Sequence, residues 1–163
     1  MVAIVDVHDA EEENVMPTLG HGLIASRLQQ ALGVYVEKHD LGYVFSAQTY
    51  FRIGAETRDT DIAYVKKERL AALPSDLDVD ADFAPDLAIE IASRSDTLAA
   101  ISRKAASYLA AGVQAVWIVN PWLRTIEVYR PHGSVTVVAR TEDLKDDSIV
   151  PVFSVALSAI FPS

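Results

Sequence analysis

The stretch that most constrains the fold runs from residue 85 to residue 119, PDLAIEIASRSDTLAAISRKAASYLAAGVQAVWIV. It begins with an apolar run typical of a buried strand, continues with an alanine-rich helical segment and ends with a second apolar run. Ser95 or Asp96 is suited to cap the start of the helix, and Gly112 to end it. This order predicts two parallel strands joined by a right-handed helical crossover.

The rest of the chain supplies further strands and at least one more long helix. With 163 residues and no repeat or Gly/Ser linker, the sequence predicts a single domain over residues 1–163, with residues 1–17 as an irregular or short-strand lead-in. The expected fold class is α/β, with a mixed central sheet flanked by helices. The remaining predicted elements are a helix over 21–40 that ends before Gly42, strands over 43–53 and 61–65, a hairpin of strands 125–130 and 134–139 joined around residues 131–133, and a short C-terminal segment over 152–161.

The composition limits which metal sites and binding partners the protein can have. The sequence contains no cysteine, so any metal must be held by oxygen or imidazole ligands, which favours hard cations. A net charge of −9 argues against a general nucleic-acid coating protein, although it leaves room for a nuclease with a local basic groove. The start of the chain lacks the basic region of a signal peptide, and no apolar run approaches the roughly 18 residues of a membrane span. We therefore expect a cytoplasmic protein with no membrane partner.

Glu90 lies in the middle of the first apolar run, where an unpaired carboxylate would be costly. Side chains alternate along a strand, so one face is apolar and the opposite face carries Glu90 between small neighbours. The apolar face consists of Leu87, Ile89 and Ile91, and the other of Asp86, Ala88, Glu90 and Ala92. The small neighbours leave space around the carboxylate for a partner other than packing.

The helix that follows offers a candidate partner. At 3.6 residues per turn, Lys104 lies at the margin of the apolar arc and Arg103 lies on the opposite side, towards solvent. The arc consists of Leu98, Ile101, Ala105, Tyr108 and Leu109. Because a crossover helix packs its apolar arc on its own sheet, Lys104 can reach towards Glu90. Asp61, at the start of a short strand, can add a second carboxylate at the sheet edge.

Two interpretations of this trio stay open on the residues alone. Two carboxylates can hold Mg²⁺ or Mn²⁺ while a lysine orients water or stabilises charge on a phosphate. Alternatively, Glu90 and Lys104 form a buried ion pair that only balances its own desolvation. Spacing predicts that the groups converge, but it does not name a reaction.

The order of "RDTDIAYV", "PDLAIEIAS", a helix with Lys, Tyr and "AGV", and a strand "VWIVNP" resembles the Uma2 or DUF820 family of endonucleases, within the PD-(D/E)XK superfamily. The resemblance extends from about His21 to the C-terminal "FSVALSAIF". It implies a restriction-endonuclease-like core in which Asp61 and Glu90 bind the metal, with the backbone carbonyl of Ile91 as a further ligand. The superfamily's usual lysine position is Ala92 here, so the resemblance implies that Lys104 is its replacement on the next helix.

Four other residues are candidates for accessory roles. Glu13 can supply a carboxylate from the N-terminal segment, and His21 matches a histidine often found before the first helix of this family. Arg58 can contact a DNA phosphate or pair with Asp61. Tyr108 is either a core residue or part of the site.

The family often has Pro immediately before the aspartate, where this chain has Thr60. Of the two tryptophans, Trp117 is expected in the core, and Trp122, in the turn sequence "NPWLR", is expected to be exposed.

The leading hypothesis from the sequence is a Mg²⁺- or Mn²⁺-dependent endonuclease that hydrolyses the DNA backbone. In it, Asp61 and Glu90 hold the cation, and Lys104 assists the attacking water or stabilises charge. The alternative is a catalytically silent homologue that acts as a binding or regulatory module, which the acidic net charge and sparse Lys and Arg favour. A homodimer suits double-strand cleavage in this superfamily, so we expect one.

Overall fold

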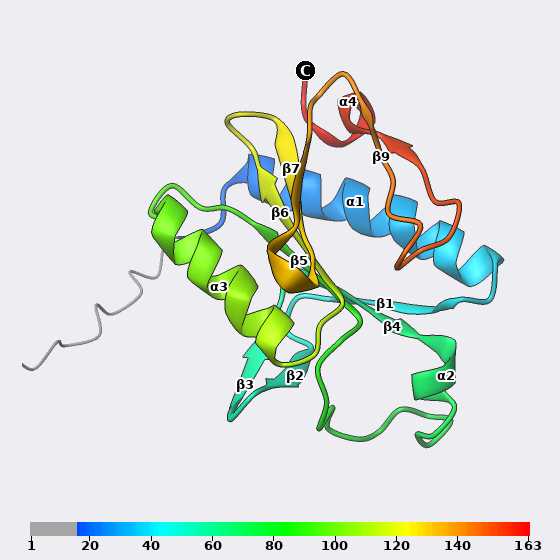
Figure 1. The fold of residues 1–163 in the computed structure, drawn as a ribbon. Coiled ribbons are helices and arrows are strands. Elements are labelled where there is room, and N and C mark those ends of the chain that lie inside the picture. Colours follow the sequence, from blue (N-terminus) through cyan, green and yellow to red (C-terminus); the bar gives the residue numbers. More distant parts are fainter. Residues whose placement is uncertain (1–15) are drawn as a thin grey trace, which may run out of the picture.

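A computed structural model describes residues 16–163, and these form a mixed six-stranded sheet with helices on both faces (Figure 1). The strand order is β1-β4-β5-β6-β7-β8; only β5 and β6 are parallel, and the other neighbours are antiparallel. The sheet strands are β1 (Gly42–Ser46), β4 (Ile62–Lys66), β5 (Leu87–Ile91), β6 (Ala115–Asn120), β7 (Thr125–Tyr129) and β8 (Val135–Val138), and the longer helices are α1 (Leu19–Lys38) and α3 (Leu98–Ala110).

Smaller elements surround this sheet. One pair of short strands forms a separate hairpin, and another pair lies near the C-terminus. They are β2 (Tyr50–Ile53), β3 (Glu56–Asp59), α2 (Lys67–Leu70), the 3-10 turn Pro131–Gly133, β9 (Asp143–Leu144), β10 (Val155–Ala156) and α4 (Leu157–Ile160). None of the helices in residues 16–163 is long and apolar enough to cross a membrane.

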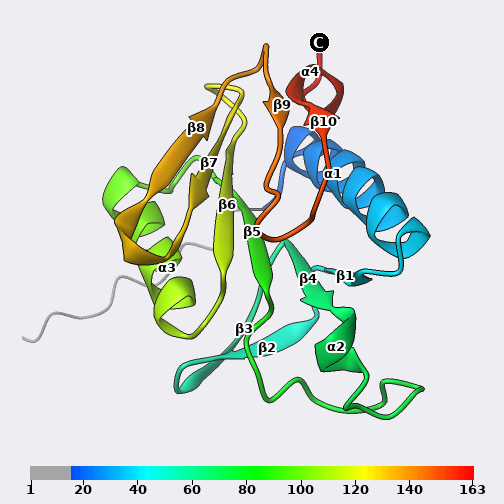
Figure 2. The same ribbon diagram turned by 45° about the vertical axis from the view of Figure 1, so that its right-hand side comes forward.

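The sheet separates two hydrophobic cores. Figures 1 and 2 show α1 on one side of the sheet and α3 on the other. One face of β5 contributes Leu87, Ile89 and Ile91 to the core beneath α1 and the C-terminal segment. The other face contributes Ala88 to the core beneath α3, which also includes Tyr108. The predicted alternation of β5 is confirmed, and it directs Glu90 to the α3 side.

The predicted crossover is also present, with β5 and β6 parallel and α3 between them. The start of α3 differs from the prediction, because neither Ser95 nor Asp96 is its N-cap. Thr97 caps the helix by accepting a hydrogen bond from the Ala100 amide at 3.1 Å. The Asp96 carboxylate instead accepts from the Ser93 amide at 2.6 Å, which closes the preceding turn. Because the Asp96 carboxylate is bonded within that turn, the N-cap of α3 is the next residue, Thr97.

The single strand predicted over residues 43–53 was wrong. The chain breaks after β1 at Gln48, whose φ of 71° is left-handed, and β2 pairs with β3 in a separate hairpin. This hairpin turns at Gly54, where φ is 63°. The strand alternation continues through "AQT", a sequence without the glycine, asparagine or proline that usually marks a turn, so the break had no strong local signal.

Candidate active site

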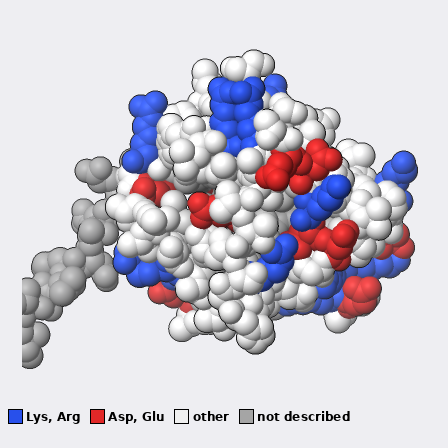
Figure 3. All heavy atoms as spheres, turned by 45° about the horizontal axis from the view of Figure 1, so that its top comes forward, with Lys and Arg blue, Asp and Glu red and all other residues white. Residues whose placement is uncertain are grey.

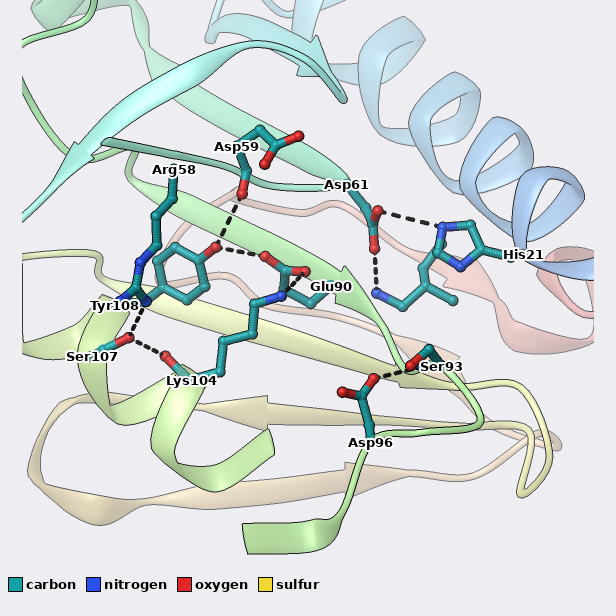
Figure 4. Close-up of polar contacts among 11 residues, drawn as sticks. His21, Arg58, Asp59, Asp61, Glu90, Ser93, Asp96, Lys104, Ser107 and Tyr108 are labelled. Atoms are coloured by element: carbon teal, nitrogen blue, oxygen red, sulfur yellow. Dashed lines mark hydrogen bonds and ion pairs between the residues drawn. The ribbon is translucent and has the colours of Figure 1, made fainter. Parts of the chain in front are cut away.

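Glu90 extends from β5 into the space between the sheet and α3, with only 8% of its surface exposed. Its carboxylate has two side-chain donors, both from α3 (Figure 4). Lys104 Nζ donates to Oε2 at 2.8 Å, and the Tyr108 hydroxyl donates to Oε1 at 2.6 Å. Because Lys104 and Tyr108 are four residues apart in a helix, they lie on one face and meet the same carboxylate.

Burial dominates the electrostatics of this cluster. It raises the pKa of Glu90 above the usual 4.5, and the nearby Asp61 charge raises it further, while Lys104 and Tyr108 act in the opposite direction. Burial alone would lower the pKa of Lys104, but the attraction and hydrogen bond of Glu90, together with the charges of Asp61 and Asp96, outweigh burial, and the pKa is raised. The pKa of Tyr108 is also raised, by burial and then by the Glu90 charge, so its hydroxyl remains a hydrogen-bond donor.

Asp61 immediately precedes β4 and is tied to the end of β5. Its Oδ2 accepts a hydrogen bond from the Ile91 amide at 2.7 Å. Its Oδ1 lies 3.4 Å from Nε2 of His21, which is in the first turn of α1. Asp61 therefore lies next to the residue that follows Glu90, and three separate segments meet at this end of the sheet (Figure 4).

The predicted trio of Asp61, Glu90 and Lys104 is thus brought together, with His21 and Tyr108 around it. The apolar arc of α3 needs one correction, since Leu98 is 72% exposed. Leu98 is the first residue of α3, so it lies at the helix end, beyond the region where α3 covers the sheet. Arg103 is exposed, as predicted.

Arg58 lies at the edge of the cluster, but it does not pair with Asp61. Its guanidinium pairs with Glu56 through Nη2 at 2.5 Å and donates through Nη1 to the Ser107 hydroxyl at 3.1 Å. Of the two roles considered for Arg58, pairing with Asp61 is not seen, because Arg58 and Glu56 alternate to the same side of the β2–β3 hairpin and pair with each other. The bond to Ser107 holds Arg58 against α3, next to Tyr108. Contact with a DNA phosphate is the role that remains to be tested for Arg58.

Some features of the cluster had no clear signal in the sequence. The bond between Asp61 and the Ile91 amide depends on the register of β4 against β5, in which Ile62 faces Ile89. The Ser107 hydroxyl, which links Arg58 to the Lys104 carbonyl, also had no signal. Tyr108 did have one, because its four-residue spacing from Lys104 places both on the face that covers Glu90.

The donor set fits a hard divalent cation. Asp61 and Glu90 offer carboxylate oxygens, and a single lysine accompanies the two carboxylates, so a cation would reduce their mutual repulsion. In residues 16–163, no three His, Asp or Glu side chains gather as a ligand set. Further ligands would have to come from a backbone carbonyl, water or substrate, as Mg²⁺ sites commonly use. Glu13, predicted as an accessory carboxylate, lies outside the described residues.

Comparisons with known proteins identify the family of this chain. The family model Uma2, described as "Putative restriction endonuclease", matches residues 9–158. The chain belongs to the Uma2 family. This membership was predicted from the order of the motifs around Asp61 and Glu90, and it supports a nuclease-like function.

A solved structure supports the fold. The crystal structure of a "putative nuclease belonging to DUF820" from Anabaena variabilis is similar, with a TM-score of 0.79 and 21% sequence identity. The match covers 90% of this chain and 83% of the other. The predicted α/β fold with a nuclease-like mixed sheet is thus confirmed. No protein with a curated description matches the sequence.

Proposed function

We propose that this Uma2 protein is a metal-dependent phosphodiesterase that hydrolyses the DNA backbone, with its active site at Asp61, Glu90 and Lys104. The observation that carries the proposal is the buried Glu90 carboxylate, bonded to Lys104 at 2.8 Å beside a second carboxylate, Asp61. Membership in a nuclease-like family supports hydrolysis of nucleic acid as the reaction at this site. Two carboxylates beside a lysine are suited to hydrolysis of a phosphodiester by a metal-activated water.

Each residue has a distinct role in this proposal. Asp61, Glu90 and the Ile91 carbonyl would hold Mg²⁺ or Mn²⁺, which when bound would polarise the phosphate and lower the pKa of a water. Lys104 holds its ammonium at the Glu90 carboxylate, where it can orient water or stabilise negative charge that develops on the phosphate. Tyr108 fixes the other Glu90 oxygen and keeps the carboxylate from rotating.

Arg58 and His21 extend the proposed site on two sides. Arg58 is anchored by Glu56 and Ser107 and is positioned to contact a phosphate of the bound strand. His21 Nε2 faces Asp61 at 3.4 Å and orients that carboxylate. Both residues therefore support substrate and ligand placement rather than bond cleavage.

The charge distribution supports a local rather than a broad contact with DNA. Figure 3 shows basic and acidic side chains interspersed on the face in view. With a net charge of −9, the protein gains little from long-range attraction to DNA. Binding would depend on the site itself and on the metal, and we propose a homodimer as a way to place one site on each strand.

A second candidate is a catalytically silent homologue that acts as a binding or regulatory module. Its supporting observation is that both Glu90 oxygens already have protein donors, as expected of a structural ion pair. The acidic charge favours it as well. The two candidates differ in whether the carboxylates bind a divalent cation.

The test combines metal binding with cleavage. Calorimetric titration with Mn²⁺ should show saturable binding to the wild type, which Asp61→Asn and Glu90→Gln should abolish without loss of fold. Plasmid and oligonucleotide DNA should be cut with Mg²⁺ or Mn²⁺ but not with Ca²⁺, whose looser coordination does not organise the attack. Asp59→Asn is the matched control, since Figure 4 shows the Asp59 carboxylate directed away from Glu90.

Two results would overturn the proposal. Cleavage that survives EDTA would exclude the metal-dependent mechanism. An intact protein that neither binds Mn²⁺ nor cuts any DNA form would support the silent homologue.

A further inference from the structure

A cavity of about 270 Å³ lies where the parallel strands β5 and β6 end, beside the His21–Asp61 contact. Its lining comes from residues 16–18 and from Gly20 and His21 at the start of α1, from residues 92–94 after β5, and from Pro121 and Trp122 after β6. His21 lines the cavity and also faces Asp61 at 3.4 Å. Open α/β sheets bind ligands beyond the carboxyl ends of their strands. The cavity therefore lies where a substrate held at Asp61 would continue.

Trp122 provides a rigid aromatic surface at this cavity. Trp122 is 52% exposed, so part of its ring is open to a ligand in the cavity. The turn that carries it is fixed, because Asn120 Oδ1 accepts from the amides of Trp122 and Leu123 at 3.1 and 3.0 Å. A fixed, exposed indole is suited to stack on a nucleic-acid base at little conformational cost.

Arg94 adds a positive charge to the same cavity. It is exposed, and among residues 16–163 it has no ion-pair partner within 4.0 Å. Arg58 and Arg69, by contrast, are paired with carboxylates. An unpaired guanidinium next to an aromatic platform matches the two parts of a nucleotide, its phosphate and its base.

We propose that this cavity binds one unpaired nucleotide of the substrate strand, with its base stacked on Trp122 and its phosphate at Arg94. The volume lies just below the range of about 300–1,000 Å³ for sites of drug-sized ligands, so it suits one nucleotide and excludes a duplex. A base inside a duplex is paired and stacked and cannot reach the indole. The enzyme therefore prefers DNA that is single-stranded next to the scissile phosphate. This inference rests on the proposed nuclease function.

Binding can be measured apart from cleavage, with Ca²⁺ in place of Mg²⁺. The probes are a fluorescein-labelled 20-nucleotide single strand, the same sequence as a blunt duplex, and the duplex with a single-stranded overhang. Wild type should bind the single strand and the overhang at least tenfold more tightly than the blunt duplex. The single strand should quench the fluorescence of Trp122, while Trp117, buried against Asp146, gives a constant background.

Two variants test the separate parts of the cavity. Trp122→Ala should remove the quenching and weaken single-strand binding by roughly tenfold, as loss of one stacked base does, with little effect on the duplex. Trp122→Phe should restore most of the preference. Arg94→Ala should weaken binding to the single strand and the overhang and reduce the salt dependence of that binding by about one phosphate contact, with little effect on the blunt duplex. Leu123→Ala and Arg140→Ala, which change exposed residues outside the cavity lining, are the matched controls.

The outcomes separate this inference from the proposed function. Metal-dependent cleavage with equal binding to single strand and duplex, or no effect of Trp122→Ala, overturns the inference alone. A Trp122→Ala change in oligomeric state with unchanged DNA binding would make the cavity a protein interface, and also overturns it. Loss of cleavage and DNA binding in every arm overturns both proposals.

Discussion

Asp86 and Glu90 lie at opposite ends of β5 and point to the same side of the sheet, yet the protein holds them in different ways. Asp86 is fully buried and accepts from the Lys66 amide at 2.8 Å, from Gln114 Nε2 at 2.9 Å and from Arg69 at 3.2 Å. Glu90 has two side-chain donors, lies beside Asp61, and its pKa is raised by burial.

The difference indicates that Asp86 has a structural role, whereas Glu90 belongs to the candidate site. Asp86 is held by a backbone amide and two side chains from other elements, so it joins β4, α2 and the start of β6. Asp146 is similar, with donors from Trp117, Arg130 and Ser148. Among the buried carboxylates of residues 16–163, Glu90 has the fewest hydrogen-bond donors. A buried carboxylate with a raised pKa beside a second carboxylate is expected where a ligand completes a site.

The largest effect should come from Asp86→Asn. The asparagine amide nitrogen cannot accept hydrogen bonds, and the variant loses the buried ion pair with Arg69. We expect the free energy of unfolding to fall by about 3 kcal/mol. Thermal unfolding should show a fall in Tm of roughly 6–12 °C at this chain length. Glu90→Gln in the same assay is the comparison, and a larger loss for Glu90→Gln than for Asp86→Asn would reverse the assignment of roles.

Lys104 provides the next test, on activity rather than stability. Its side chain is 44% exposed, so Lys104→Met should keep the fold. If the ammonium stabilises developing charge, cleavage should fall on the order of a hundredfold or more, with metal affinity near wild type. Arg103→Met is the matched control, because Arg103 is exposed on the same helix and should show little effect.

Two results would contradict this role for Lys104. Equal losses of activity in the two variants would indicate that α3 contributes only general positive charge. Unfolding of Lys104→Met by several kcal/mol would make Glu90 and Lys104 a structural pair.

The parts of this site that lie on regular elements could be predicted from the sequence. The alternation of β5 directed Glu90 away from the apolar face, and the helical spacing of α3 directed Lys104 towards it. Both patterns are local, so they do not depend on how other segments pack. The parallel pairing of β5 and β6 followed from the crossover rule.

Long-range pairings could not be predicted in the same way. The Asp61 bond to Ile91, the three partners of Asp86 and the cavity beside Trp122 all join segments distant in the chain. Their geometry depends on strand register and on loop paths, which no local pattern specifies. The exposed Trp122 in its turn could be predicted, but its proximity to Arg94 and His21 could not.

Glu90→Gln should also show how much ionised Glu90 destabilises the fold without metal. Because the pKa of Glu90 is raised above 4.5, the folded state holds this proton more tightly than the unfolded state, so stability falls as pH rises above that value. Glutamine carries no charge, so the variant should be more stable than the wild type at neutral pH. The gain should vanish below roughly pH 4.5, where Glu90 is protonated in both states. Urea unfolding at pH 4 and pH 7 measures it, and a loss of stability at pH 7 would contradict the expectation.

The smallest effect should come from replacing Thr60, a neutral residue that directly precedes Asp61. Its buried hydroxyl has no hydrogen-bond partner among the described residues, and the hydroxyl of Thr125, in β7, is in the same state. Replacing either threonine with valine keeps the shape and removes an unsatisfied polar atom, so each variant should gain up to about 1 kcal/mol in unfolding free energy. Thr125→Val is the control, because Thr125 belongs to the strand pair β6–β7 and should leave cleavage unchanged. If Thr125→Val gains stability while Thr60→Val loses Mn²⁺ affinity or cleavage, the Thr60 hydroxyl acts at the site beside Asp61.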